Sequence, residues 1–404
     1  MTSDSANFKL LLAAEFTPGS PGGDWFHLKQ LLRGFDWNRL SWWSMFGEPK
    51  ETSNLGARLD TCRVPGRLIP ARRFLPAKRF LMRSLAVPWA AAHLRKFVAL
   101  QKPDLIWIMA HDWTIPVFHR VLPALGIPWH ISVYDMPDIG SNVRRLGASM
   151  AEAHLRMTEK LYAKASSRCV IGQPMALEFE RKTGVKPELI ERCAVEPEAL
   201  EALEALTARR PAAGPRTTLR IGYAGTIIAE ETFALFVSAL QKIRHELPAP
   251  VEIHVFGSER YGDRRWFDPS LIVEHGFVTD AELDKLYGEC HWGLAMMHLD
   301  DADPRYNRFS FPCKFTMALS SGLPLICLGH PQSGLMALAQ HYRLGIMITD
   351  HDLEKTAALL RQELPRTDRL AEFHAEIVRC AQTDFNAGKN RSRLHALFHD
   401  DLNR

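Results

Sequence analysis

The sequence predicts an α/β protein of two Rossmann-like domains, each a doubly wound parallel sheet, facing each other across a cleft. Three observations support this prediction. Short, nearly continuous apolar runs alternate with helical patterns along most of the chain, which is typical of parallel sheets covered on both faces. Glycine turns follow several of the runs, as at Gly22 and Gly225. Residues 201–218, which are rich in alanine and contain Pro211, Gly214 and Pro215, separate two such series as a linker.

The first series predicts an N-terminal domain over residues 1–200. Its expected strands are 8–14, 105–109, 129–134 and 168–171, and its expected helices are 26–32, 89–100, 116–125, 144–165 and 174–182. Residues 35–80 fit neither pattern. They contain Trp37, Trp42, Trp43 and Phe46, which form either a packed aromatic cluster or a surface that contacts a substrate or partner.

The second series predicts a C-terminal domain over residues 219–375. Its expected strands are 219–224, 251–256, 271–274, 292–297, 323–328 and 345–349, and its expected helices are 230–246, 279–288, 315–320 and 333–341. Thr279 and Glu282 have the spacing of a capping box, which marks the start of a helix. Residues 376–404 are expected to be helical and to pack back on the N-terminal domain.

Composition excludes several classes of protein. Of the 404 residues, 46% are hydrophobic and 24% are charged, so the chain is globular rather than disordered. No apolar run reaches the roughly 18 residues of a membrane span, and the polar N-terminus does not resemble a secretory signal. The seven cysteines are scattered without a C-x-x-C pair, which argues against disulfides and structural zinc. We therefore expect a cytoplasmic location.

Basic residues are concentrated between residues 58 and 83, where only Asp60 opposes eight of them and apolar residues are interleaved. Such a segment can lie on an anionic membrane surface, at the inner face of the membrane. A solvated basic face explains the pattern equally well. Nucleic acid is a weaker third option and is not expected as a partner, because no nucleic-acid motif accompanies the patch and the net charge is only +4.

A family resemblance emerges in the C-terminal half. Gly276-Phe277-Val278 precedes the capped helix, a strand follows at residues 292–296, and residues 309–326 read FSFPCKFTMALSSGLPLI. This order resembles the GT-B glycosyltransferases of the large retaining family 4, specifically over residues 271–328. Tyr223-Ala224-Gly225-Thr226 resembles the first glycine turn of their donor domain. The resemblance covers nearly the whole chain and is weak before residue 100.

The resemblance implies transfer of a sugar from a nucleotide-sugar, with neither metal nor other cofactor. A leaving nucleoside diphosphate needs backbone N–H groups at glycine turns and helix N-termini, and a cation. The implied donor-binding residues are Gly225, Thr226, Gly257, Phe277, Val278, Ser310, Pro312, Lys314 and Met317. The implied acceptor-binding residues are Gly22, Gly23 and His27, and the catalytic candidates at predicted strand ends are His111, Asp112 and Asp135.

The chain departs from the family pattern at the donor site. The family's two glutamates would stand at 309 and 317, where this chain has Phe309 and Met317. A thioether accepts ribose hydrogen bonds poorly. The Arg and Lys that often follow the first glycine turn are also missing. Arg260, Arg305 or Arg308 could supply the lost charge.

The sequence therefore favours a retaining, hexosyltransferase-type enzyme that acts on a glycan or lipid-linked acceptor in polysaccharide or envelope glycan biosynthesis. A second hypothesis is a noncatalytic GT-B protein that binds glycan or stabilises a partner transferase, favoured by the absence of a glutamate at 317. A third is another GT-B enzyme, such as a nucleotide-sugar epimerase, which would turn over the donor without an acceptor.

Overall fold

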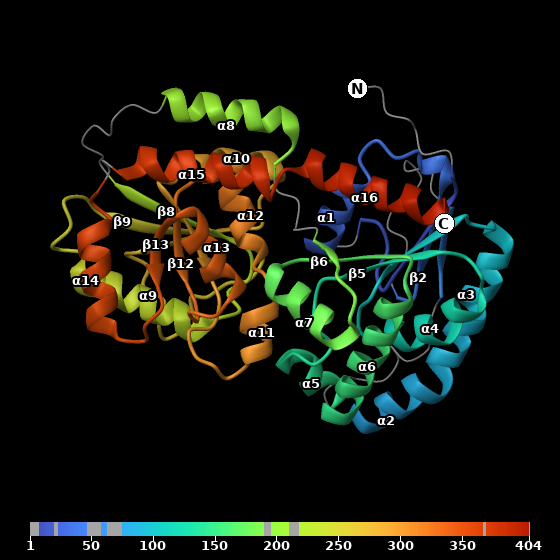
Figure 1. Cartoon of the computed structure of the whole chain (residues 1–404). Coiled ribbons are helices and arrows are strands. Elements are labelled where there is room, and N and C mark those ends of the chain that lie inside the picture. Colours follow the sequence, from blue (N-terminus) through green and yellow to red (C-terminus); the bar gives the residue numbers. More distant parts are fainter. Residues whose placement is uncertain are drawn as a thin grey trace. The chain divides into compact units, whose positions relative to one another are not determined.

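The computed structural model describes residues 8–19, 23–46, 58–62, 75–189, 195–209, 218–366 and 369–403. The chain divides into two compact units. One comprises Met1–Glu191 and Lys389–Arg404, and the other comprises Arg192–Gly388. Each unit is a parallel sheet with helices on both faces, as Figure 1 shows, so the predicted α/β architecture with two doubly wound sheets is confirmed.

The N-terminal sheet has seven strands in the order β3-β2-β1-β4-β5-β6-β7, and every pair is parallel. They are β1 (Leu10–Ala14), β2 (Leu40–Ser44), β3 (Arg58–Thr61), β4 (Leu105–Met109), β5 (Trp129–Val133), β6 (Ser167–Val170) and β7 (Glu188–Leu189). The chain order reverses between β1 and β4. This topological switch point is where doubly wound sheets bind ligands, at the carboxyl ends of the strands.

The helices of this unit are α1 (Gly23–Leu31), α2 (Leu75–Leu81), α3 (Val87–Gln101), α4 (Thr114–Val121), α5 (Gly140–Leu146), α6 (Ala148–Lys164), α7 (Gln173–Thr183) and α16 (Ala387–Leu402). Short turns are η1 (Trp37–Arg39) and η4 (Leu122–Ala124), and η3 (Met82–Ala86) is a π-helical turn that joins α2 to α3. The predicted single helix 144–165 is wrong. Gly147, with φ of 85°, ends α5 and begins α6, because that backbone conformation breaks a helix and suits glycine.

The tryptophan cluster belongs to the core. Trp42 and Trp43 lie in β2 and are fully buried. Their indole N–H groups donate to the Phe16 carbonyl at 3.0 Å and to His93 Nδ1 at 3.1 Å, so both polar atoms are satisfied as buried indoles require. For these two residues the packed-cluster interpretation is confirmed.

Helix α16 packs against the N-terminal unit at the other end of the sequence. Phe398 contacts the rings of Phe8, Trp107 and His130, with centroids 6.3, 5.5 and 5.3 Å apart. Near the end of the helix, Ser167 donates a hydrogen bond to Asp401. The C-terminal helix therefore completes the core of a unit whose first strand lies at the opposite end of the sequence.

The C-terminal unit has six parallel strands in the order β10-β9-β8-β11-β12-β13. They are β8 (Leu219–Ala224), β9 (Val251–Phe256), β10 (Ile272–Gly276), β11 (Trp292–Met296), β12 (Leu325–Leu328) and β13 (Gly345–Ile348). The helices are α8 (Pro197–Arg209), α9 (Glu230–Ile243), α10 (Asp280–Gly288), α11 (Pro304–Phe309), α12 (Cys313–Ser320), α13 (Gly334–Tyr342), α14 (Leu353–Glu363) and α15 (Leu370–Thr383). Here the switch point lies between β8 and β11.

Two apolar cores hold this sheet, one on each face. One joins the sheet to α9 and α14, and the other joins it to α8, α12 and α13. The expected capping box at the start of α10 is formed by Thr279 and Glu282. Residues 201–209 of the expected linker are helical in α8, and this helix belongs to the C-terminal unit from its start at Pro197. Helix α15 also belongs to this unit, so only Lys389–Arg404 of the expected C-terminal segment joins the N-terminal unit.

Candidate functional site

Polar side chains gather where β1, β4 and β5 end, at the switch point of the N-terminal sheet. Glu15 directly follows β1, His111 and Asp112 follow β4, and Tyr134 and Asp135 follow β5. These three strands are neighbours in the sheet. The carboxyl ends of parallel strands meet at one edge, so the sheet itself brings together side chains about 100 residues apart in sequence.

His111 and Glu15 form a close pair at this edge. Nδ1 of His111 lies 2.5 Å from Oε2 of Glu15. A carboxylate at Nδ1 favours the tautomer with hydrogen on Nδ1, which leaves Nε2 as an acceptor. The His111 side chain is 33% exposed. The pair thus holds an oriented imidazole that is accessible to a substrate.

Asp112 is a buried carboxylate in a strained backbone position. Its φ is 41°, in the left-handed region that few residues other than glycine adopt, and only 4% of the residue is exposed. Arg145 Nη1 lies 2.6 Å from its Oδ2. Burial, and then the negative charge of Glu15, raise the pKa of Asp112 to about 6, against the opposing charges of Arg145, His111 and Lys78. Strain and a perturbed pKa are both typical of functional sites.

Replacing Asp112 by asparagine is expected to change how stability depends on pH. The folded-state pKa of about 6 exceeds the ordinary 3.8, so wild-type stability falls as pH rises through this window and stays lower above it. The asparagine side chain cannot ionise, and asparagine tolerates positive φ. The free energy of unfolding in urea should therefore favour the variant by up to about 3 kcal/mol at pH 7.5 and by little at pH 4. A difference that does not vary with pH would contradict the raised pKa.

Arg145 is held in place by the loop after β5. Its Nη2 donates to Asn142 Oδ1 at 2.8 Å, and Asn142 Nδ2 donates to the Met136 carbonyl at 3.3 Å. Arg145 and Glu15 are partners that sequence reasoning missed. For Glu15, its place directly after the first predicted strand was the available signal; for Arg145, the predicted continuous helix offered none.

The remaining N-terminal candidates occupy different environments. His27 in α1 is 2% exposed, and its ring lies 4.9 Å from the ring of Tyr134, so its imidazole packs within the unit. Asp135 is half-buried beyond the end of β5. Gly23 is the first residue of α1. Gly22 lies outside the described residues.

Glycines end four of the strands in the C-terminal unit. Gly225, Gly257 and Gly329 follow β8, β9 and β12, and Gly276 is the last residue of β10. Gly225 has φ of 112°, which requires glycine. Its N–H donates to the Phe256 carbonyl at 2.7 Å, and the Gly257 N–H donates to the Gly276 carbonyl at 3.0 Å. A Cβ on Gly257 would lie 3.2 Å from the Gly225 oxygen. At these glycines the edge presents backbone rather than side chains.

The turn after β8 is fixed by two buried tyrosines. Tyr223 Oη donates to the Thr226 carbonyl at 2.8 Å, and the Ile227 N–H donates to Tyr261 Oη at 2.9 Å. Thr226 itself is exposed. Two acidic residues, Glu230 and Glu231, start α9. They oppose an anion at this helix N-terminus, so charge for a diphosphate has to come from other elements.

Phe277 and Val278 follow β10 at the same edge. The Phe277 side chain is 86% exposed, which is unusual for phenylalanine, and Val278 is half-buried. Arg260 lies over the backbone beside them, since a Cβ on Gly276 would come within 2.7 Å of Arg260 Nη2. Of the three arginines considered as substitutes for the missing cations, Arg260 is the one placed beside Phe277.

Helix α12 carries the segment that resembles the family most closely. It packs against β8 and β11. Its N-cap is Pro312, no side chain caps it, and its first turn holds no acidic residue. Ser310 is buried just before it, and Met317 is half-buried within it; the side chain of Lys314 lies outside the described residues. Arg305 and Arg308 of α11 stack on Phe309 at 5.0 and 5.4 Å.

Two features are absent from the part of the chain that the structure describes. No group of three or more His, Cys, Asp or Glu side chains is arranged there to hold a metal ion. None of the described helices combines the length and the apolar character needed to cross a bilayer.

The fold is that of the GT-B glycosyltransferases. Three solved structures illustrate the likeness: HepE of Anabaena in complex with UDP-glucose, sucrose-phosphate synthase of Thermosynechococcus elongatus, and WaaG, a glycosyltransferase involved in lipopolysaccharide biosynthesis. Their identities are 14%, 14% and 11%, with TM-scores of 0.64, 0.66 and 0.60. They cover 96%, 97% and 95% of this chain and 99%, 98% and 99% of their own. No family model and no curated protein matches the sequence.

Proposed function

We propose that the protein is a glycosyltransferase that moves a sugar from a nucleotide-sugar to an acceptor. The proposal rests on the glycine edge of the C-terminal unit, which is the edge of the sheet where Gly225, Gly257, Gly276 and Gly329 lie at the ends of their strands. The glycine turns let a diphosphate approach the backbone closely, and the uncapped N-terminus of α12 offers N–H donors suited to such a leaving group. The GT-B fold of the solved structures supports this assignment, and one of them is a complex with UDP-glucose.

In this proposal the C-terminal unit binds the donor nucleotide. Phe277 and Val278 contact the base. The turns at Gly225, Thr226 and Gly257 let the diphosphate approach the backbone closely. The N–H donors come from the first turn of α12, because the N–H groups of Gly225 and Gly257 already bond the Phe256 and Gly276 carbonyls. Lys314 and Arg260 supply positive charge, which is needed because α9 begins with two glutamates. The segment that contains α12 also contributes three donor-binding residues, Ser310, Pro312 and Met317.

The N-terminal unit supplies the reactive side chains. His111, oriented by Glu15 at 2.5 Å, binds a hydroxyl of the transferred sugar through Nε2. Asp112 is buried with a raised pKa, so it acts through its charge on the neighbouring His111–Glu15 pair. Asp135 exchanges protons or hydrogen bonds with sugar hydroxyls. Gly22 and Gly23 contact the acceptor, and His27 positions Tyr134. We propose, from the family resemblance, that transfer retains the anomeric configuration and needs no metal.

Restoring the family's second glutamate should strengthen donor binding. Met317→Glu places a carboxylate in α12 where the resemblance predicts contact with the ribose hydroxyls. A hydrogen bond to a charged group is worth about 1.5–3 kcal/mol, so the donor Kd should fall about tenfold, as measured by calorimetric titration. Met317→Gln has a similar size without the charge and should give a smaller gain. An unchanged or higher Kd for Met317→Glu would show that this side chain does not face the ribose.

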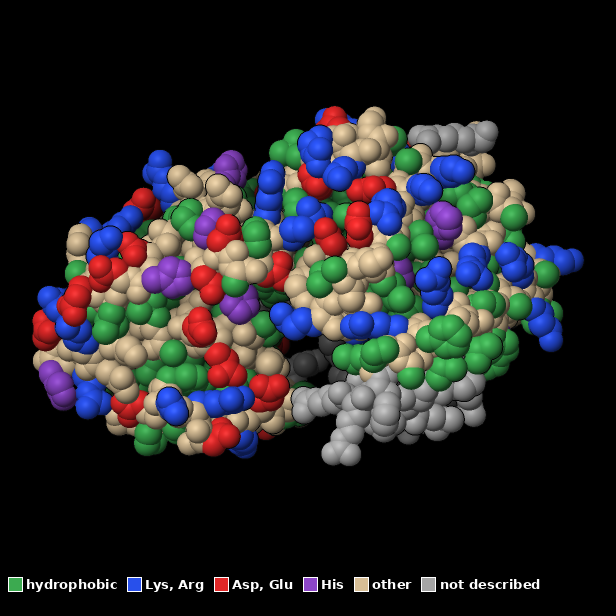
Figure 2. Space-filling view, turned by 90° about the horizontal axis from the view of Figure 1, so that it is seen from below, with side chains coloured by type: hydrophobic (Ala, Val, Ile, Leu, Met, Phe, Trp, Pro, Cys, Tyr) green, Lys and Arg blue, Asp and Glu red, His purple; other side chains and the backbone are tan. Residues whose placement is uncertain are grey.

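We further propose that the acceptor is lipid-linked or membrane-proximal. The run from α2 through η3 to α3 exposes Phe80, Leu85 and Trp89 by 68%, 64% and 44%. Lys78 and Arg83 belong to the same run. Exposed aromatic and aliphatic residues beside basic ones suit an anionic membrane surface. Figure 2 shows Lys and Arg side chains scattered among apolar ones on the side of the N-terminal unit where α2, α5 and α6 lie.

A transfer assay tests the proposal. Purified protein with EDTA would be offered UDP-, GDP- and ADP-sugars, with either sugar phosphates or a lipid extract as acceptor, and nucleoside diphosphate release would be followed. Release that requires an acceptor supports the transferase. Conversion of the donor to its epimer in the absence of an acceptor would show that the protein is a nucleotide-sugar epimerase instead. Tight donor binding without turnover under any condition would favour the noncatalytic protein, an alternative that the methionine at position 317 motivates.

A further inference from the structure

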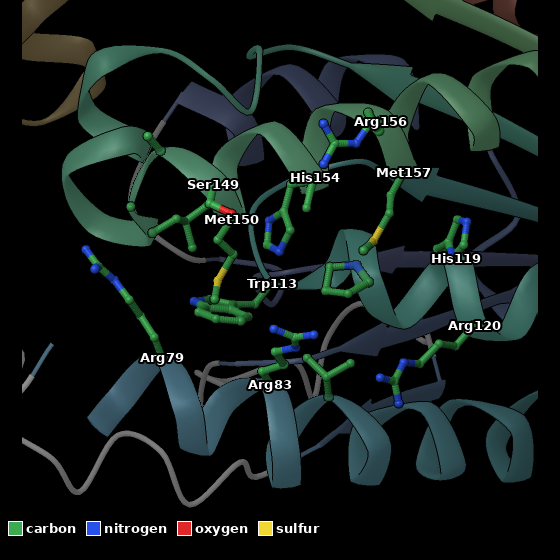
Figure 3. A pocket seen from close by; sticks show the side chains of 16 residues that line it. Arg79, Arg83, Trp113, His119, Arg120, Ser149, Met150, His154, Arg156 and Met157 are labelled. Atoms are coloured by element: carbon green, nitrogen blue, oxygen red, sulfur yellow. The ribbon is translucent and has the colours of Figure 1, made fainter. Parts of the chain in front are cut away.

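A pocket of about 580 Å³ lies among helices of the N-terminal unit. It lies between the end of α2 with η3, helix α4, and the N-terminal part of α6, as Figure 3 shows. Neither His111 nor Asp112 lines it, and it plays no part in the transfer reaction proposed above. Its volume is within the range of small-molecule sites.

The charged side chains that line the pocket are all basic. Among the described lining residues are four arginines and two histidines, with no Asp or Glu. Arg79 is engaged with the carbonyls of Arg144 and Arg145, both at 3.0 Å, and Arg156 pairs with Glu152 at 2.5 Å. The guanidinium groups of Arg83 and Arg120 form no hydrogen bond or ion pair with any described residue. Two cations are therefore available to a ligand.

The first turn of α6 faces the same space. This helix is 17 residues long, its N-cap is Gly147, no side chain caps it, and no acidic residue lies in its first turn. Gly147, Ala148 and Ser149 line the pocket. The N–H groups of an uncapped first turn attract anions through the helix dipole. Glycine is needed at 147 for its φ of 85°, and a Cβ there would lie 3.1 Å from Arg79 Nη1.

His154 is a second and independent indication of a ligand. The residue is 2% exposed, it lines the pocket, and its Nδ1 has no hydrogen-bond partner among the described residues. Its ring packs edge-on against Trp113 at 5.6 Å, and in Figure 3 both rings point into the pocket near Arg83. Burial, and then the charge of Arg145, lower the pKa of His154 to about 4. The neutral ring can donate one hydrogen bond, and a buried polar atom without a partner is costly.

Apart from Ser149 and the basic residues, the lining is apolar or glycine. Trp113, Pro116, Met150 and Met157 contribute most of it, and the methionines can adapt to an irregular hydrocarbon group. Figure 3 shows the two thioethers on the same side of the pocket as His154. A single molecule can fit both parts of this lining. Its anionic group would lie among the basic side chains, and its apolar part would pack against the methionines.

We propose that this pocket binds a phosphate ester that carries an apolar group, with the phosphate contacted by Arg83, Arg120, His154 and the first turn of α6. An arginine guanidinium can donate two parallel hydrogen bonds to phosphate oxygens, and the free N–H groups of a helix N-terminus also donate to them. The ester can be a lipid headgroup or a free organic phosphate, and the experiment distinguishes these two sources.

The test is calorimetric titration of the full-length protein with four probes. They are dihexanoyl phosphatidic acid below its micelle concentration, hexyl phosphate, inorganic phosphate and dihexanoyl phosphatidylcholine. Preferred binding of the phosphatidic acid supports the proposal and assigns a lipid phosphate. Equal or preferred binding of hexyl phosphate supports it and assigns a free phosphate ester. Binding of none, binding of inorganic phosphate as tight as that of the esters, or equal binding of the zwitterionic phosphatidylcholine overturns it.

Variants show whether binding occurs in this pocket. Arg83→Glu and Arg120→Glu should each raise the Kd about tenfold to a hundredfold, the value of a charge-assisted hydrogen bond. His154→Phe keeps the ring against Trp113 and removes Nδ1, and should weaken phosphate binding while leaving the thermal midpoint nearly unchanged. Arg181→Glu, the same charge change on the exposed side of α7, should not alter the Kd. A Kd unaffected by all three pocket variants overturns the proposal.

Discussion

Replacing His111 by alanine is expected to lower kcat for sugar transfer on the order of a hundredfold, the usual contribution of a positioned acid–base or hydrogen-bonding side chain. The imidazole is the one candidate that is both oriented, by Glu15 at 2.5 Å, and 33% exposed. The donor nucleotide binds the other unit in our proposal, so Kd for the nucleoside diphosphate should change little. Steady-state kinetics with calorimetry separates the two quantities.

Two controls sharpen this result. Glu15→Gln keeps a hydrogen-bonding partner for Nδ1 but removes its charge, so kcat should fall less than in the alanine variant. His351→Ala removes an exposed histidine just before α14 and should leave kcat unchanged. If His111→Ala retains wild-type kcat, the strand-end edge of the N-terminal unit is not the reactive site.

Replacing Gly225 by valine is expected to abolish nucleotide binding, with Kd raised about a hundredfold or more. The backbone at 225 has φ of 112° and its N–H is already bonded to the Phe256 carbonyl at 2.7 Å. A β-branched residue cannot adopt that conformation without a strain of about 1–3 kcal/mol, so the turn must move. The close approach of the diphosphate to this turn is then lost. Fluorescence titration with the preferred nucleoside diphosphate measures the change.

Gly262→Val is the matched control in the same unit. A Cβ placed on Gly262 would have no neighbouring atom within 4 Å, and this glycine has no positive φ, so valine fits there without strain. It should leave both Kd and the thermal midpoint near wild type. Urea unfolding of Gly225→Val establishes that the variant is folded at the titration temperature. Wild-type affinity in a folded Gly225→Val protein would place the nucleotide elsewhere.

Periodicity predicted the two sheets because buried parallel strands are short apolar runs, whatever their order. Strand order itself carries no local signal. Glu15 and His111 are 96 residues apart, and only the adjacency of β1 and β4 in the sheet joins them. For that reason the sequence could mark Glu15 and His111 each as a residue that follows a strand, but it could not pair them.

The wrongly predicted single helix 144–165 shows a second limit of sequence-based prediction, which is that a helix break can depend on tertiary packing. A single glycine inside a helical pattern is often tolerated, and whether it breaks the helix depends on packing. Here Gly147 adopts φ of 85°, and Arg79 fills the space a side chain would need. The break lets α5 carry Arg145 toward Asp112 while α6 presents its first turn to the basic pocket. Both features depend on contacts with α2, whose Arg79 lies 65 residues before Arg144.

The most direct test of the central claim is nucleotide binding by the wild-type protein in the presence of EDTA. UDP, GDP, ADP and CMP would be compared by thermal shift and then by calorimetric titration. The account predicts one-to-one binding of one nucleotide, with a stabilisation of about 2.7 kcal/mol at a hundredfold excess over Kd, and its loss in Gly225→Val. Absence of binding by every nucleotide, with the protein folded, would contradict a donor site at the glycine edge of the C-terminal unit.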